Sequence, residues 1–362
     1  MTPRPALHLP LNGSLAGTAA NVAYTATGNG ALRYRSADLG GRQCALVEVG
    51  GTNIAPNPFA ALNTTGWPGT NWTLASSALP SALPDDDSTS GVVTALKISR
   101  EADIAGAVAL NVLSGATLTV APYRLEFWCY LPVGVQFGPP TGLKFGGVSD
   151  PGQFAGSTQT NAEYNAEDVG AWVRMVGLVT PAGGDLFGSI YLRNFDTALY
   201  PVKAGDSAYL TCVNFQQAAY ESTLIPELDS GGSLLTGYAW SGTPHASSST
   251  RALTTIDIAY AEPIEHIFCR YSEDWGETWA TAHLTEPDTF GDYAVVQYAD
   301  DEFSIESSRA LLIRDFAVYD TTLSGAQIAA VEAAIEAGTI GAGRKPLFVP
   351  RGYPVVFVNV RK

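Results

Sequence analysis

The chain has 362 residues, 46% of them hydrophobic, which favours two or three separately buried cores over a single one. Its formal net charge is -15, and a negative surface repels phosphate groups, so we expect neither nucleic-acid binding nor attachment to anionic lipid. No apolar run is long enough to cross a bilayer, and the first residues lack the apolar stretch of a secretory signal, so we expect no membrane insertion.

Turn-forming residues punctuate the whole chain. It contains 37 glycines and 22 prolines, and clusters of these with Ser, Thr, Asn and Asp separate short apolar runs. A β-sandwich needs a turn after each short strand, so this pattern predicts an all-β fold. Residues 51–225 in particular read as a long series of strands.

The clearest strand pattern within that series is Tyr123–Tyr130. Its residues alternate with the period of two that a strand requires, and the odd-numbered positions are apolar or aromatic. Trp128 and Tyr130 fall on the opposite face with charged neighbours. This pattern indicates an antiparallel sheet with one buried face and one wetter face.

The four cysteines and four histidines do not have the spacing of a metal site. Cys44, Cys129, Cys212 and Cys269 lie far apart in the sequence and form no C-x-x-C pair. Buried free thiols are therefore favoured over disulfides, and a structural zinc ion is not expected.

The only convincing helix lies near the C-terminus, at residues 323–338. Ser324 and Gln327 have the spacing of a capping box, and Leu323 and Ile328 have that of a hydrophobic staple. Gly338 can end the helix with a left-handed cap. A single helix among many strands supports the all-β class.

The last segment, residues 339–362, is apolar and basic and forms a C-terminal arm. Val355–Val358 would promote aggregation as a free sheet edge, so we expect it to be paired. Two interpretations stay open: the arm adds a strand to its own sheet, or it adds a strand to a neighbouring subunit.

Two segments bracket the middle of the chain. Ala45–Val49, followed by Thr52–Phe59 and Trp67, resembles the opening of carbohydrate-binding-type jelly rolls in bacteriophage tail and virion proteins. The arginine that usually precedes the Thr-Asn pair is Gly51 here, so a role for that arginine does not carry over. Ala208–Pro226 is similar to the closing strand of the same domain. The resemblance implies that residues 51–226 form one inserted jelly roll.

Segments from the two ends of the chain resemble one further domain. Leu9–Ser14 looks like the first strand of a laminin-G or concanavalin-like sandwich, and Leu312–Ser324 looks like its last strand. Gly237–Arg251 is similar to a stretch of the same phage chains. The resemblance implies a split concanavalin-like sandwich made of residues 1–50 and 227–338. The expected architecture is two β-sandwich or jelly-roll domains, one inserted in the other.

The resemblance also implies a function. It points to a phage virion structural protein of the tail, baseplate or fibre, assembled in the host cytoplasm with other virion proteins. By analogy with such appendages we expect a homo-oligomer, with a trimer as the guess, that contacts glycans of the host cell surface. Two alternatives stay open: a glycan-degrading hydrolase of the depolymerase or sialidase-like kind, and a capsid decoration or head-fibre protein.

No motif indicates catalysis. The chain has no G-x-S-x-G elbow, P-loop or H-E-x-x-H motif, and no spacing singles out a carboxylate pair for glycoside hydrolysis. Ser272–Trp279 fits the S-x-D-x-G-x-T-W Asp box, in which the Asp and Ser side chains hold a turn. A sialidase propeller would repeat this motif, and one copy favours a structural turn. We therefore expect a non-enzymatic protein.

Aromatic side chains are the candidate ligand-binding residues, because the C–H faces of sugar rings stack on Trp and Tyr. The alternative for each tryptophan is that it fills the core or covers a sheet edge. The candidates lie on the wetter face of the 123–130 strand or in loop-like contexts, and they are Trp67, Trp72, Trp128, Tyr130, Trp240 and Trp275.

One acidic run offers oxygen ligands. Asp85, Asp86 and Asp87 stand together after Pro84 and could coordinate a structural calcium ion. The alternative, which we favour, is a solvated turn. No other cofactor is expected.

Overall fold

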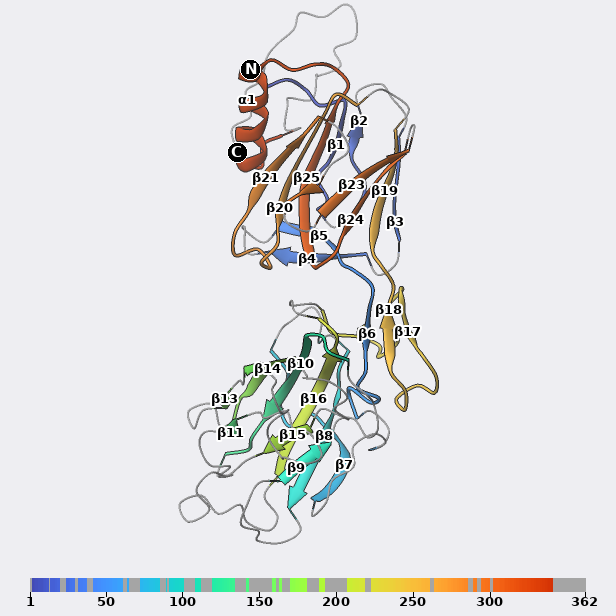
Figure 1. The fold of residues 1–362 in the computed structure, drawn as a ribbon, viewed down its shortest axis with the longest axis vertical. Helices are drawn as coiled ribbons and strands as arrows, with labels where there is room; N and C mark the ends of the chain where they lie inside the picture. The colour runs from blue at the N-terminus through green and yellow to red at the C-terminus, as the bar shows by residue number, and fades with distance from the viewer. Residues whose placement is uncertain are drawn as a thin grey trace, which may run out of the picture.

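The computed structural model of this chain describes residues 2–12, 14–19, 24–29, 32–37, 42–60, 64, 72–84, 89, 91–100, 108–111, 119–133, 141–142, 158–160, 163–164, 170–180, 189–192, 207–218, 223–260, 264–285, 289–291, 294–299 and 302–340. Over these residues the chain forms antiparallel β-sheets and a single helix, α1 (Gly325–Glu336). The predicted all-β fold class is confirmed. Figure 1 shows two groups of sheets, an upper and a lower one, joined by a narrow region.

A seven-stranded sheet in the upper group brings the two ends of the chain together. Its order is β2-β1-β25-β20-β21, and β5 pairs with both β25 and β4. β1 lies antiparallel to β25, with Leu7 opposite Val318. The strands are β1 (Leu7–Leu9), β2 (Thr18–Ala19), β4 (Arg33–Ala37), β5 (Arg42–Val47), β20 (His266–Ser272), β21 (Ala280–Leu284) and β25 (Leu311–Tyr319).

The first strand lies earlier than the predicted Leu9–Ser14. Leu11 has a positive φ of 51°, which an extended strand does not allow, so the chain turns away after Leu9. The partner segment agrees with the sequence pattern, because β25 covers most of the predicted Leu312–Ser324 stretch.

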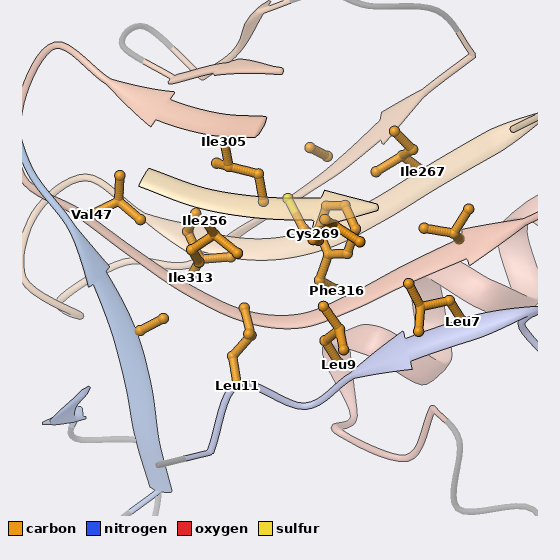
Figure 2. Packing of buried hydrophobic residues seen from close by; sticks show 14 of the residues in the cluster. Leu7, Leu9, Leu11, Val47, Ile256, Ile267, Cys269, Ile305, Ile313 and Phe316 are labelled. Carbon is orange, nitrogen blue, oxygen red and sulfur yellow. The ribbon is translucent and has the colours of Figure 1, made fainter. Parts of the chain in front are cut away.

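A five-stranded sheet packs on the seven-stranded one. Its order is β22-β23-β24-β19-β3. Leu9, Ile313 and Phe316 of the first sheet share a buried cluster with Ile256 and Ile305 of the second, and Figure 2 shows these side chains meeting in one layer. Each fully buried side chain of this kind contributes about 1.5–3 kcal/mol. The strands of the second sheet are β3 (Tyr24–Asn29), β19 (Thr255–Tyr260), β22 (Thr289–Phe290), β23 (Ala294–Ala299) and β24 (Glu302–Ser307).

Helix α1 covers the outer face of the seven-stranded sheet (Figure 1). Val331 and Ile335 pack against Phe268 and Tyr319 there. Burial of this one apolar stripe explains why a short helix is stable on an otherwise all-β fold.

Both ends of α1 have the predicted caps. Ser324 and Gln327 form the capping box, and the Ser324 amide donates to Gln327 Oε1 at 2.9 Å. At the other end, Gly338 has a φ of 62° and its amide donates to the Ile335 carbonyl at 2.9 Å. The Thr339 amide donates to the Ala334 carbonyl at 2.8 Å, which completes a Schellman motif.

All four cysteines are buried and free, as predicted. Burial raises the pKa of both Cys129 and Cys269 to about 12 and that of Cys44 to about 11. A thiol whose pKa is raised in this way carries little thiolate at neutral pH, so these cysteines act as small apolar side chains.

The lower group is built on a six-stranded sheet of order β12-β14-β10-β16-β8-β7. β10 alternates as predicted: its odd-numbered residues are buried, and Trp128 and Tyr130 are only partly buried. The six strands are β7 (Trp72–Ala78), β8 (Thr94–Arg100), β10 (Tyr123–Tyr130), β12 (Thr158–Thr160), β14 (Trp172–Thr180) and β16 (Ser207–Gln216). Two small sheets pair β9 (Val108–Asn111) with β15 (Ser189–Leu192) and β11 (Thr141–Gly142) with β13 (Glu163–Tyr164).

A three-stranded sheet lies between the two groups (Figure 1). It consists of β6 (Gly51–Asn53), β18 (Ser249–Arg251) and β17 (Tyr238–Trp240), with β18 in the middle. The predicted domain boundaries at residues 50 and 226 stay a prediction. This sheet combines β6, which follows residue 50, with β17 and β18, which follow residue 226.

The described part of the chain contains no helix long and apolar enough to span a membrane. Nearly all of the predicted C-terminal arm, residues 341–362, lies outside the described residues, and both interpretations of it stay predictions.

Candidate functional site

The outer face of the six-stranded sheet carries a row of aromatic rings. The strand register places Tyr130 opposite Trp172 of β14 on one side and opposite Tyr209 of β16 on the other. Directly opposed residues of antiparallel strands point to the same face, so the three rings lie side by side across three strands. We call Trp172, Tyr130 and Tyr209 the aromatic row.

The rings of the aromatic row contact one another. The ring centroids of Tyr130 and Trp172 are 5.4 Å apart, and those of Tyr130 and Tyr209 are 6.1 Å apart and nearly perpendicular. Trp172 is buried and its Nε1 donates to the Ser81 carbonyl at 3.0 Å, which fixes its ring. Tyr130 and Tyr209 are only partly buried. The row therefore has one anchored end and two rings that reach solvent.

Polar side chains continue the row. Lys97 of β8 lies opposite Tyr209, and Ser99 and Ser207 hydrogen-bond each other one pair further along at 3.0 Å. An ammonium group and hydroxyls beside tyrosine rings can take sugar hydroxyls while the rings stack on C–H faces. These side chains give the surface the chemistry of a binding surface.

The acid on the same face is neutralised. Glu126 is buried and forms ion pairs with Arg124 and with Arg174, the latter at 2.6 Å. Arg174 lies on the neighbouring strand opposite Trp128, so the pairs bind two strands together. A carboxylate held by two guanidinium groups is a structural group.

Trp128 lies on the same face of β10, between Glu126 and Tyr130, and it is covered by other side chains. It packs against the buried cluster of Phe59, Val92, Cys212 and Leu224. Cys212 belongs to β16 of the same sheet, and the other three residues lie in the chain between or beyond the sheet strands. For this residue the structure matches the alternative in which a tryptophan covers a core.

Trp240 lies on another sheet, and Trp275 lies in the turn between β20 and β21. Trp240, in β17, is partly buried and its ring centroid is 4.9 Å from that of His245. Trp275 packs on the cluster that holds Cys44, and the Arg35 guanidinium lies 5.8 Å from its ring. The predicted aromatic residues are thus not gathered in one place.

The remaining candidates are not placed. Trp72 begins β7, and only its backbone is described. Trp67 and the acidic run Asp85–Asp87 lie outside the described residues, so the calcium prediction stays untested there. Within the described ranges no cluster of His, Cys, Asp and Glu could hold a metal ion.

The Asp box forms the predicted turn. Ser272 Oγ donates to Asp274 Oδ1 and accepts from the Gly276 amide, both at 2.8 Å. The Thr278 amide donates to Asp274 Oδ1 at 2.8 Å. Gly276 takes the expected positive φ, 93°, and Trp275 takes one as well, 61°. Burial would raise the pKa of Asp274, but the hydrogen bonds outweigh this and lower it, as suits a carboxylate that holds a turn.

A second polar cluster lies where the two groups of sheets meet. Glu48 is fully buried and pairs with Arg33 at 2.7 Å and with Arg251 at 3.1 Å. Thr223 donates to Glu48 through its amide at 3.0 Å and through its hydroxyl at 2.7 Å. Arg251 also donates to the Val49 carbonyl at 2.8 Å. We call these residues, with Glu227 and Arg35, the junction network.

Glu227 extends the junction network. It is buried and pairs with Arg35 at 2.9 Å and also with Arg33. Burial alone would raise the pKa of the Glu48 carboxyl, but Arg251, Arg33 and the Thr223 hydrogen bonds lower it below its ordinary value. A general acid needs a raised pKa, so the lowered pKa of Glu48 fits a structural carboxylate.

The junction network explains the sequence segments that resemble the phage jelly rolls. Glu48 belongs to the first segment, Thr223 to the second and Arg251 to the third. Asn53, also in the first, is fully buried: its Nδ2 donates to the Val213 carbonyl at 2.7 Å, and its Oδ1 accepts from the Phe215 amide at 2.8 Å. The segments therefore meet at one buried joint.

Sequence reasoning missed two members of the aromatic row. The local sequence around Trp172 and around Tyr209 indicates a strand in each case. Their proximity to Tyr130 depends on which strands are neighbours and in what register, which no local pattern states. The junction network was missed for the same reason.

The comparisons with known proteins are distant. No family model matches the chain, and no curated protein matches its sequence. Among solved structures, the N-terminal CBM22-1-CBM22-2 tandem domain of Paenibacillus barcinonensis Xyn10C shares 10% identity over 76% of this chain and 99% of its own, with a TM-score of 0.28. The Endo-D glycoside hydrolase domain of Streptococcus pneumoniae R6 shares 13% identity over 67% of this chain and 37% of its own, with a TM-score of 0.19. At such TM-scores neither likeness carries an argument about function.

Proposed function

We propose that this chain is a non-enzymatic recognition protein that binds glycan through the aromatic row of its six-stranded sheet. The observation that carries the proposal is the pair Tyr130 and Tyr209, whose partly buried rings lie beside Lys97 on one face of the sheet. Rings fixed by a neighbour lose little entropy when they stack on a sugar, since the anchored Trp172 already holds them in place.

Binding without hydrolysis fits the acidic residues of the described chain. Three of the buried carboxylates, those of Glu48, Glu126 and Glu227, are each held in ion pairs by two arginines. Hydrolysis by the same chain is the competing function. It predicts new reducing ends when the purified protein is incubated with a host polysaccharide.

The direct test is a glycan array probed with the full chain and three variants. Tyr130→Ala combined with Tyr209→Ala is expected to weaken binding about tenfold or more, because two stacking contacts are lost. Tyr209→Phe keeps the ring and is expected to retain most of the affinity. Val120→Ser is the matched control, since Val120 is an exposed residue of the same group of sheets. Equal binding by the double variant and the control would reject the aromatic row as the site.

We further propose that the protein belongs to a phage tail, baseplate or fibre. Support for this comes from the sequence resemblance alone. Many copies in a homo-oligomer would turn weak sugar contacts into firm attachment. Labelled antibody on intact particles tests this: label on the head would instead support a capsid decoration or head-fibre protein, and unlabelled particles would remove the virion role.

A further inference from the structure

A polar strip crosses the outer face of the seven-stranded sheet. Arg270 of β20 lies opposite Arg314 of β25 on one side and opposite Thr281 of β21 on the other. The neighbouring pair on this face, Phe268 and Ala317, lies under helix α1. We call Arg270, Arg314 and Thr281 the arginine strip.

Two like charges directly opposite on neighbouring strands destabilise a sheet unless something compensates them. The Arg270 and Arg314 side chains are 16% and 7% exposed, so water screens them little. A sheet keeps such a pair at a cost to its stability, which points to a role other than stability.

Few acceptors face these arginines. Arg270 donates to Thr281 Oγ1 at 3.1 Å, and its other contact is Glu336 Oε1 at 4.0 Å. Arg314 Nε lies 3.5 Å from Asp315 Oδ2, and its guanidinium lies 5.0 Å from the Trp279 ring. Among the described residues, the Nε atoms of both arginines are buried and have no hydrogen-bond partner. Two guanidinium groups thus keep most of their donors for another acceptor.

The charge balance agrees with this. Asp315 is the one buried carboxylate that the described chain places at the strip, and it also lies 3.5 Å from Nε2 of His8. Glu336 is the second acid, and its side chain is 59% exposed at the end of α1. An exposed pair at 4.0 Å contributes little, so one positive charge of the strip remains without a firm partner.

We propose that the arginine strip binds a carboxylate, as presented by an acidic sugar. The planar fork of a guanidinium matches a carboxylate with two parallel hydrogen bonds. The Glu336 carboxylate already reaches toward Arg270 from helix α1, and a ligand carboxylate would displace it. Trp279 borders the strip on the side away from the helix and offers an apolar face beside the charge.

The strip is a second site, separate from the aromatic row. It lies on the upper group of sheets, whereas the aromatic row lies on the lower one (Figure 1). This inference therefore does not rest on the proposed function.

Calorimetric titration of the full chain tests the proposal with three probes: glucuronate, its neutral counterpart methyl glucoside, and sulfate. Glucuronate is expected to bind and methyl glucoside is not. Arg270→Gln is expected to weaken glucuronate binding at least about tenfold, because it removes a charged fork. Arg270→Lys keeps the charge without the fork and is expected to lie between the two.

The Glu336→Gln variant gives a more specific test. It removes the competing carboxylate from an exposed position, so glucuronate should bind more tightly, by a factor of a few. Arg4→Gln is the matched control, since Arg4 is an exposed arginine of the same group of sheets. Thermal unfolding of each variant confirms that it is folded.

Three results would overturn the proposal. Glucuronate affinity that Arg270→Gln leaves unchanged places the ligand elsewhere. Equal binding of methyl glucoside, or binding of sulfate alone, removes the carboxylate assignment. Loss of array binding in the Tyr130→Ala and Tyr209→Ala variant, with glucuronate binding intact, would instead support the proposal that the two sites are separate.

Discussion

The chain buries arginines in two regions, and the regions differ in how many acceptors each guanidinium meets. In the junction network, Arg251 contacts Glu48, Thr223 and the Val49 carbonyl. In the arginine strip, Arg314 faces one carboxylate at 3.5 Å and a tryptophan ring. In the junction network the arginine charges are paired with acceptors of the chain itself, as in a structural ion-pair network. The arginine strip keeps donors for a ligand.

The two regions should also differ in how much stability is lost when a buried charge is removed. Removing one partner from a satisfied cluster leaves its opposite charge without compensation, which is costly. Removing one of two like charges relieves repulsion and is inexpensive. Stability measurements on single variants therefore distinguish the two regions directly.

Glu48→Ala should have the largest effect. It leaves Arg33 and Arg251 buried without their shared carboxylate, and we expect a loss of about 3–5 kcal/mol in the free energy of unfolding. Urea unfolding measures this, with Glu336→Gln as an exposed control that should stay within about 0.5 kcal/mol. A loss as small as that of the control would mean that the joint does not contribute to stability.

Acid should weaken the junction network by a smaller amount, since it removes the charge of Glu48 without removing the side chain. The pKa of Glu48 is lower in the folded chain than its ordinary value of 4.5. Its contribution to stability is therefore complete above that value and disappears as the pH falls through the folded-state pKa. Unfolding in urea at a series of pH values from neutral to acidic measures the decline. Glu48→Gln should flatten it, and an unchanged decline in that variant would assign the acid sensitivity to other carboxylates.

Arg270→Gln should have the smallest effect on stability. The change removes a like-charge contact with Arg314 and one hydrogen bond to Thr281, and the two effects oppose each other. We expect a change within about 1 kcal/mol in the free energy of unfolding. Thermal unfolding measures it, and a loss as large as that of Glu48→Ala would make the strip a structural network instead.

Local patterns predicted much of the fold. The alternation of β10, the caps of α1 and the Asp box turn each depend on residues close in sequence, where spacing states geometry directly. The strand at residues 7–9 was placed a few residues late, because nothing local shows that Leu11 takes a positive φ.

Contacts between distant strands were not predictable in the same way. Arg251 of β18 lies directly opposite Gly51 of β6 and reaches Glu48. Arg251 and Gly51 are 200 positions apart in the sequence, and only the register of β6 and β18 brings them together. The proximity of Tyr209 and Trp172 to Tyr130 likewise depends on strand register, which the sequence does not show.

The hydrogen bonds between Glu48 and Thr254 have a consequence for how the chain can change. The Thr254 amide donates to the Glu48 carbonyl at 2.9 Å and its hydroxyl to the same atom at 2.8 Å, although the two residues are 206 positions apart. These hydrogen bonds close residues 49–253 into one loop whose two ends are held together at the upper sandwich. The entropy of closing a loop grows only with the logarithm of its length. A change in the length of that loop would therefore disturb the sandwich little, provided that Arg251, Thr223 and Glu227 stay in place as partners of Glu48, Arg33 and Arg35.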